Sequence, residues 1–237
     1  MFLGISKWFY LFSFLASLIF ILFPQIDIFI STLFYSPSEG FFWANNIFIL
    51  FLYAIPKPIV ILSVLALIIL IIDLSFRKQL LNIRPLLLLY FISVMVVGPG
   101  LIVNTLFKDN WGRARPVNVM EFHGPMMFTP AWTITNQCNT NCSFVCGHAG
   151  GTYSLIALAL LVKRRRKMAI ALAIGIGSLV GLGRIIQGGH FFSDVVLSFI
   201  FVYLTAKIIY YFVFDKKLFS FIDARYSSDE TYKTATI

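Results

Sequence analysis

The stretch MAIALAIGIGSLVGLGRIIQGGHFFSDVVLSFIFVYLTAKIIYYFVF, residues 168–214, contains two apolar runs joined by a short polar connection. The runs cover about residues 168–186 and 192–214, and each is long enough to cross roughly 30 Å of hydrocarbon as a helix. Arg184, His190 and Asp194 lie at or near this connection in the pattern R-x5-H-x3-D. The stretch therefore predicts two membrane-spanning helices with charged and titratable residues where they meet at the membrane surface.

The rest of the chain has the same apolar character. Of its 237 residues, 59% are hydrophobic and only 12% are charged, and the mean hydropathy is +0.87. This composition indicates an all-α polytopic membrane protein, which we take as a single domain over residues 1–237. Further apolar windows fall at about 8–30, 47–72, 85–107 and 144–162, which gives six expected transmembrane helices.

Three of these windows contain features that affect their limits. Lys7 precedes the first window, as in a signal peptide, but no small-x-small cleavage site follows, so we expect an uncleaved first helix. Pro56-Lys57-Pro58 interrupts the second window, so this span begins either near residue 47 or near Pro56, with residues 41–54 then forming an interfacial helix. Gly98-Pro99-Gly100 is expected to kink the third window.

The positions of the basic residues, which give the chain a net charge of +9, predict how the chain lies in the membrane. With six spans, Lys108, Arg113, Arg115 and Arg184 fall on one side, together with all three histidines. By the positive-inside rule the opposite side is cytoplasmic, and it holds both termini and a polar tail at about 216–237. We therefore expect a bacterial inner-membrane protein with a periplasmic site and no nucleic-acid partner. The cytoplasmic basic residues are Lys7, Arg77, Lys78, Arg84, the run Lys163 to Lys167, Lys216, Lys217, Arg225 and Lys233.

Three motifs gather on the expected periplasmic side. They are K-x6-R-P from Lys108 to Pro116, then Cys146-Gly147-His148, and the R-x5-H-x3-D pattern that begins at Arg184. Two histidines, a carboxylate and several fixed cations are suited to phosphoryl transfer without a metal ion. The cations would hold the phosphate oxygens, and the missing side chain of Gly147 would let an anion approach the backbone.

The two histidines are expected to have different roles. His190 and Asp194 are four residues apart at a helix start, so the carboxylate can orient the imidazole and support its action as a nucleophile. His148 is placed to protonate a leaving alkoxide. A metal site is disfavoured because the neighbouring side chains are cations, whereas a divalent ion prefers carboxylates.

These motifs resemble those of the type 2 phosphatidic acid phosphatase (PAP2) superfamily, from the second span to the sixth. The family pattern is K-x6-R-P, P-S-G-H and S-R-x5-H-x3-D on a six-helix core. In this chain Gly183 replaces the Ser of the third element, and Val145 and Cys146 replace the Pro and Ser of the second. The resemblance implies that His190 forms a phosphohistidine, with Asp194 orienting it and His148 as the acid, and that no cofactor is used. The implied phosphate-binding residues are Lys108, Arg115, Arg184, Cys146 and Gly147.

The loop at residues 117–143 is the natural place for headgroup recognition. Its run Phe128-Thr129-Pro130-Ala131-Trp132 looks like the lipid A 1-phosphatase branch of the superfamily, as do Asn-Cys-Ser-Phe at residues 141–144 and Trp-Gly-Arg-Ala-Arg-Pro at residues 111–116. That resemblance implies a phosphorylated membrane lipid as substrate and removal of the lipid A 1-phosphate. Undecaprenyl diphosphate and phosphatidylglycerophosphate remain alternative substrates, and an anion-binding transporter is the alternative outside the enzymes. Arg113, His123 and Lys57 are candidate headgroup contacts.

The three cysteines allow several interpretations. Cys146 suggests a cysteine phosphatase with the pattern C-x5-R, but Thr152 stands where the arginine would be required. Cys138, Cys142 and Cys146 are spaced by four, yet no fourth zinc ligand is evenly placed. In an oxidising periplasm Cys138 and Cys142 either form a small disulfide or stay free, and the sequence leaves both open.

Overall fold

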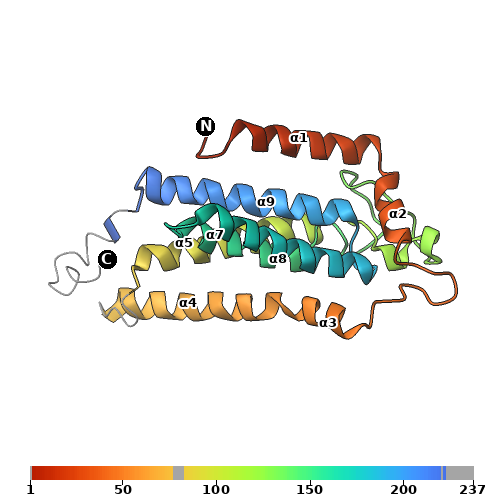
Figure 1. Cartoon of the computed structure of the whole chain (residues 1–237), viewed down its shortest axis with the longest axis horizontal. Helices are drawn as coiled ribbons and strands as arrows, with labels where there is room; N and C mark the ends of the chain where they lie inside the picture. Colours follow the sequence, from red (N-terminus) through yellow and green to blue (C-terminus); the bar gives the residue numbers. More distant parts are fainter. Residues whose placement is uncertain (1, 77–82, 220, 223–237) are drawn as a thin grey trace.

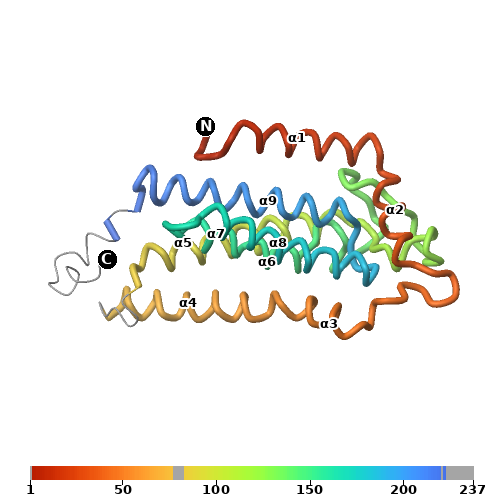
Figure 2. Tube along the Cα trace, in the orientation of Figure 1, coloured from red at the N-terminus to blue at the C-terminus, as the bar shows by residue number. Residues whose placement is uncertain are grey.

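The computed structural model describes residues 2–76, 83–219 and 221–222. Within these residues the chain is helical, and its only β-type pairs are isolated bridges. The long helices lie side by side along one axis and form an elongated bundle (Figures 1 and 2). The all-α prediction is confirmed. The elements are α1 (Lys7–Leu22), α2 (Gln25–Thr32), α3 (Ile47–Ala54), α4 (Pro56–Phe76), α5 (Pro85–Met95), η1 (Val96–Lys108), η2 (Pro116–Asn118), η3 (Met120–Phe122), α6 (Gly147–Tyr153), α7 (Leu155–Leu161), α8 (Arg166–Ile186), α9 (Phe192–Tyr210) and η4 (Tyr211–Asp215).

Four helices in the described part of the chain are long and apolar enough to cross a membrane. A fifth span results if α1 and α2, which are bent by 84° at a short break, count as one broken span. The six spans expected from the sequence are thus not confirmed. The four are Ile47–Phe76, Pro85–Lys108, Arg166–Ile186 and Phe192–Asp215.

The first window breaks where Pro24 follows Phe23. Proline lacks the N–H that a continuing helix requires and disfavours helical geometry in the residue before it. α1 therefore ends at Leu22, and α2 turns across the end of the bundle (Figure 1). The expectation of one helix over residues 8–30 was wrong, and the turn places the buried Asp27 of α2 inside the protein.

The fourth window forms two short helices, so the single long span expected over residues 144–162 is not confirmed. α6 and α7 have seven residues each and meet at Ser154, whose hydroxyl donates to the carbonyl of Gly151 at 2.6 Å. They pack against α8 and α9, and Ile156 and Ala157 are fully buried. The pair therefore lies in the core of the bundle, where a full lipid-spanning length is not required.

The second and third windows each form one span. Asn46 caps α3 by accepting from the Phe48 amide at 2.9 Å, and α3 continues into α4 as a helix of 30 residues. The span therefore begins at Ile47, not at Pro56. In the third window the helix changes from α to π geometry at Val96, and this accommodates Pro99 without ending the helix.

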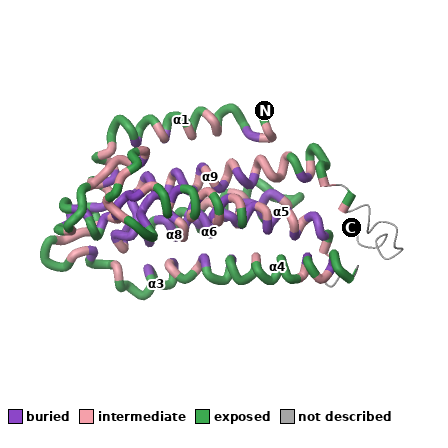
Figure 3. The backbone as a smooth tube through the Cα atoms, turned by 180° about the vertical axis from the view of Figure 1, so that it is seen from behind, coloured by how far each residue is buried: buried purple, intermediate pink, exposed green. Residues whose placement is uncertain are grey.

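The outer helices and the inner helices differ in burial. Figure 3 shows that buried residues are concentrated along the central helices, whereas α1 and α4 are largely exposed. Their exposed residues are mostly apolar, as expected for surfaces that contact lipid. The polar connections gather at the two ends of the bundle.

The two ends of the helix bundle carry different segments of the chain. Arg166, at the start of α8, donates to the Tyr210 hydroxyl at 3.0 Å, so the basic run Lys163 to Lys167 lies at the same end as the C-terminus of α9. The connection from α2 to α3 and residues 109–146 lie at the opposite end (Figure 1). Most of the expected polar tail at about 216–237 lies outside the described residues, as do Arg77 and Lys78.

Candidate active site

The first two motifs meet at Gly147. A Cβ atom at this position would lie 2.8 Å from Oδ1 of Asn104 and 3.4 Å from Nζ of Lys108. Only glycine fits here without displacing its neighbours, so the backbone at the start of α6 and the Lys108 ammonium are held close together. Both groups lie at the end of the bundle that carries the loop of residues 109–146.

His190 is completely buried, and its two ring nitrogens have different environments. Nδ1 lies 2.7 Å from the carbonyl oxygen of Ser143, and because a carbonyl only accepts, Nδ1 carries the proton. Within the described residues Nε2 has no hydrogen-bond partner. The pKa of His190 is lowered to about 4, chiefly by burial and also by Arg184 and Lys108, against the opposing effect of Asp194. The ring is therefore neutral near pH 7, with the lone pair of Nε2 available.

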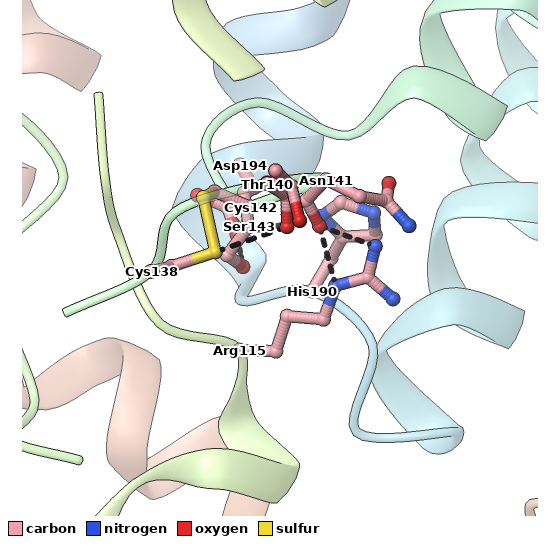
Figure 4. Close-up of a disulfide and its surroundings, with 8 residues drawn as sticks. All are labelled: Arg115, Cys138, Thr140, Asn141, Cys142, Ser143, His190 and Asp194. Carbon is pink, nitrogen blue, oxygen red and sulfur yellow. Dashed lines mark hydrogen bonds and ion pairs between the residues drawn. A yellow bond between two sulfur atoms is a disulfide. The ribbon is translucent and has the colours of Figure 1, made fainter. Parts of the chain in front are cut away.

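Asp194 acts on His190 through an intermediate residue. Its Oδ2 atom is 3.7 Å from Nδ1 of His190, which is too long for a hydrogen bond. The same atom accepts from the Ser143 hydroxyl at 2.5 Å and from the Phe191 amide at 2.9 Å. Asp194 thus holds Ser143, whose carbonyl holds His190 (Figure 4). From the sequence we expected Asp194 to orient the imidazole directly. In the structure Ser143 lies between the two residues and bonds to both.

The three predicted phosphate-binding cations converge on the histidines. The pKa of His148 is lowered to about 3, chiefly by burial and also by Arg184, Lys108 and Arg115, so all three cations act on this ring. The guanidinium of Arg184 lies across Gly189 and donates to Gln187. Two imidazoles beside three cations are the groups that the sequence analysis predicted for binding and transfer of one phosphate group.

Arg115 is anchored by a disulfide-closed loop. Cys138 and Cys142 are bonded to each other, and between them the carbonyl oxygen of Asn141 accepts from Nε and Nη2 of Arg115 at 3.1 and 2.7 Å (Figure 4). The disulfide that the sequence left open is therefore formed, and it belongs to the phosphate-binding end of the molecule.

Residues 85–218 match the PAP2 superfamily, and this segment contains every motif residue described above. The chain belongs to the PAP2 superfamily. It is accordingly a transmembrane phosphatase, which confirms the class of enzyme expected from the motifs.

Three curated proteins similar to this PAP2 phosphatase are named lipid A 4′-phosphatase. The one from Francisella tularensis subsp. novicida (strain U112) is 40% identical over 210 residues, which cover 86% of this chain and 93% of the relative. The one from Rhizobium leguminosarum is 36% identical over 110 residues, or 46% of this chain and 47% of the relative. The one from Rhizobium etli (strain ATCC 51251 / DSM 11541 / JCM 21823 / NBRC 15573 / CFN 42) is 34% identical over 110 residues, or 46% and 43%. No solved structure matches the chain.

These names correct one expectation from the sequence. The resemblance was to the lipid A 1-phosphatase branch, whereas the similar proteins are named for the 4′ position. The loop residues that suggested the 1-phosphate have structural roles here: the carbonyls of Thr129 and Ala131 accept from Arg113 and Trp111. Such packing does not distinguish one phosphate position from the other.

Arg113 lies inside the PAP2 site instead of at its rim. Its side chain is fully buried and pairs with Asp194 at 2.6 Å and with Asp27 at 2.8 Å. A guanidinium that is buried and bonded in this way cannot contact a headgroup, so that expectation was wrong. The sequence pattern did not identify Asp27, although an acidic residue in an apolar stretch is a signal of a buried or functional group.

The other two candidate headgroup contacts are exposed. Nδ1 of His123 lies 2.6 Å from the hydroxyl of Tyr35, on the loop between α2 and α3. Lys57 is exposed at the second position of α4. Within the described residues neither side chain contacts His148 or His190, and contact of either with a headgroup stays a prediction.

Cys146 differs from the serine that is usual in the superfamily, and its thiol is inert. The side chain is fully buried, and burial raises the pKa of the thiol to about 11. This effect outweighs those of the Ala149 amide, Arg184 and Lys108, which lower the pKa. The thiol therefore stays protonated at neutral pH. This agrees with the rejection of a cysteine-nucleophile mechanism.

Tyr53 is a residue of the PAP2 site that the motifs did not reveal. Its ring centre is 4.4 Å from that of His148, and the guanidinium of Arg184 lies 5.0 Å from the same ring. Tyr53 lies on α3, and no charged or titratable pattern surrounds it in the sequence. Only the packing of α3 against α8 brings it to the site.

Proposed function

We propose that this phosphatase removes the 4′-phosphate of lipid A at the periplasmic face of a bacterial inner membrane. The names of the similar proteins, lipid A 4′-phosphatase in each case, support the substrate and the position. The observation that carries the chemistry is the free Nε2 atom of His190, which is buried and within the electrostatic reach of Arg184 and Lys108. These two cations attract a phosphate to the atom that would attack it.

In the first step Nε2 of His190 attacks phosphorus, and the bond from phosphorus to the sugar oxygen breaks. The imidazole gains positive charge as the P–N bond forms, and its Nδ1 proton stays bonded to the Ser143 carbonyl. Lys108, Arg115 and Arg184 offset the charge on the three non-bridging oxygens. His148 gives its proton to the departing sugar oxygen. The cations lower the proton affinity of His148 in the free protein, and the negative charge of the bound phosphate raises it, so His148 takes up its proton when the monoanionic substrate phosphate binds.

In the second step water hydrolyses the phosphohistidine. His148, now neutral, accepts a proton from the attacking water, the P–N bond breaks, and inorganic phosphate leaves. His190 returns to its neutral form with Nδ1 protonated. The cycle consumes one water molecule and requires no redox partner.

The orientation in the membrane follows from charge. The basic run Lys163 to Lys167 lies at the end opposite to the catalytic residues, and such runs remain on the cytoplasmic side. The proposed periplasmic location of the site agrees with the Cys138–Cys142 disulfide, because disulfides persist in oxidising compartments. Both termini would then be cytoplasmic.

The test is phosphate release by the detergent-purified full chain from lipid A, with the lipid products resolved by mass spectrometry. Phosphatidylglycerophosphate and undecaprenyl diphosphate are assayed beside it. Loss of the 4′-phosphate with retention of the 1-phosphate is the expected result, and His190→Ala should abolish it. Loss of the 1-phosphate, or preference for another lipid, would overturn the substrate assignment. Binding of lipid A without release of phosphate would indicate the non-enzymatic alternative.

A further inference from the structure

A second concave site lies at the same end of the bundle as the catalytic residues. It is a cavity of about 400 Å³ lined by the connection between α2 and α3 and by Val117, Phe122 and Gln187. Small-molecule sites in proteins range over roughly 300–1,000 Å³, so this cavity is large enough for one ring of a substrate. The motifs of the superfamily do not include the residues that line it.

The cavity shares a wall with the phosphate-binding residues. Gln187 accepts from Nη1 of Arg184 through Oε1, and its Nε2 atom donates to the carbonyl of Ala44 in the cavity wall at 3.3 Å. On the other side, Val117 follows Arg115 by two residues, and its amide donates to the Gly188 carbonyl at 3.1 Å. A group in the cavity therefore lies next to a phosphate held by Arg184 and Arg115.

The chemistry of the cavity differs from that of the phosphate site. Its polar side chains are those of Tyr35, Glu39, Asn45 and Gln187, and none of the described residues that line it is a lysine or arginine. The Glu39 carboxylate repels a second phosphate but accepts hydrogen bonds from hydroxyl and amide groups. Phe41 and Phe122 contribute apolar surface beside these groups. The lining suits an uncharged ring that carries hydroxyl and amide groups.

The loop that carries the cavity also has contacts suited to the membrane surface. Phe42 and Trp43 are exposed immediately after Phe41, and aromatic residues such as tryptophan gather at the boundary between hydrocarbon and water. Tyr35 is fixed by its hydrogen bond to His123 and by ring contacts with Phe41 and Phe122. These contacts hold the cavity wall at the depth of lipid headgroups.

We propose that this cavity binds the sugar ring that carries the reacting phosphate, by hydrogen bonds from the ring's hydroxyl and amide groups to Glu39, Asn45 and Gln187. The inference rests on the proposed function and assigns a specificity site to it. The cavity then selects phosphorylated amino sugars over phosphate monoesters of glycerol lipids, while Arg184 and Arg115 bind the phosphate of either.

The test compares two substrates, lipid A and phosphatidic acid, with the full-length protein in detergent. The variant is Glu39→Ala combined with Asn45→Ala, because both side chains are exposed and neither forms a hydrogen bond within the described part of the chain. Glu121→Ala, which removes an exposed carboxylate outside the cavity, is the matched control. We expect kcat/KM for lipid A to fall by about tenfold in the double variant, as for the loss of two hydrogen bonds, and that for phosphatidic acid to change less than about twofold.

The outcomes separate this inference from the proposed function. An equal loss on both substrates, or no loss on either, in an active protein would overturn the sugar site alone. If the wild-type protein releases phosphate from phosphatidic acid but not from lipid A, the sugar site and the substrate assignment both fail. If it releases phosphate from neither, the catalytic proposal fails as well.

Discussion

The guanidinium of Arg113 lies 2.6 Å from the carboxylate of Asp194, and both side chains are fully buried. Nη2 of the same guanidinium pairs with Asp27 of α2, at 2.8 Å. Asp27 also accepts from the amide and hydroxyl of Ser193, so it holds the start of α9 directly. Through Arg113, the short helix α2 is thereby connected to Asp194. Asp194 holds Ser143, and the Ser143 carbonyl holds His190.

Replacement of Asp27 should therefore affect both stability and turnover. Asp27→Ala leaves a buried arginine with one carboxylate fewer, and breaking a buried ion pair costs about 3–5 kcal/mol. We expect a lower thermal unfolding temperature in detergent and a large fall in kcat. Glu121→Gln, which removes an exposed carboxylate, is the control. An unfolding temperature and kcat equal to those of the control would show that Asp27 does not support the site.

The sequence identified the motif residues that lie together, but it did not identify the residues that hold them in place. The spacing of His190 and Asp194 within R-x5-H-x3-D correctly indicated that they lie together, since four residues span about one helical turn. The positions of Asp27 and Tyr53 depend on how α2 and α3 pack against distant helices, and no local pattern records such packing. For the same reason Arg113, three residues from a motif end at Pro116, was expected at the surface but is buried between two carboxylates.

The breaks in two of the expected spans have a physical reason. Hydropathy identifies apolar segments but does not distinguish a lipid-facing helix from one inside a bundle. α6 and α7 are apolar because they are buried among other helices, and they are short and interrupted at Ser154. Pro24 is visible in the sequence, but one continuous helix was expected there, and the bend of 84° accompanies the contact of α2 with α9.

Tyr53 should contribute to catalysis through its ring. It packs against His148 and Arg184, and a cation over an aromatic face contributes roughly 0.5–2 kcal/mol. We expect Tyr53→Ala to lower kcat/KM by about tenfold and Tyr53→Phe to stay within about threefold of wild type. Steady-state kinetics on lipid A measures both variants. Equal losses in the two would assign the effect to the hydroxyl group and contradict a role for the ring.

The pH dependence of kcat/KM should show the low pKa of His190. Burial lowers this pKa from 6.5 to about 4, so the ring is neutral above about pH 4 and becomes protonated as the pH falls through that value. The nucleophile is thus present at neutral pH and is lost only in acid. Because kcat/KM reports groups of the free enzyme and the free substrate, its acid limb should lie near pH 4, and it should fall again above about pH 6, where the substrate phosphate loses the proton that His148 takes up. An acid limb that remains near 6.5 would mean that His190 has an ordinary, solvated environment.

The disulfide should affect phosphate binding through Arg115. Removal of both sulfurs in Cys138→Ser with Cys142→Ser loosens the loop whose Asn141 carbonyl holds the guanidinium. We expect KM to rise by about fivefold, equivalent to roughly 1 kcal/mol, with little change in kcat. A reducing agent should produce the same change in the wild type and none in the double variant. An unchanged KM in both cases would separate the loop from substrate binding.

The most direct test of the account is detection of the phosphoenzyme. The purified protein is mixed with lipid A labelled in its 4′-phosphate, quenched in alkali within one turnover, digested, and its peptides are examined for the label. The account predicts a labelled peptide that contains His190 and neither label nor turnover in His190→Ala. Substantial phosphate release by His190→Ala, or turnover without labelled His190 in the wild type, would contradict it.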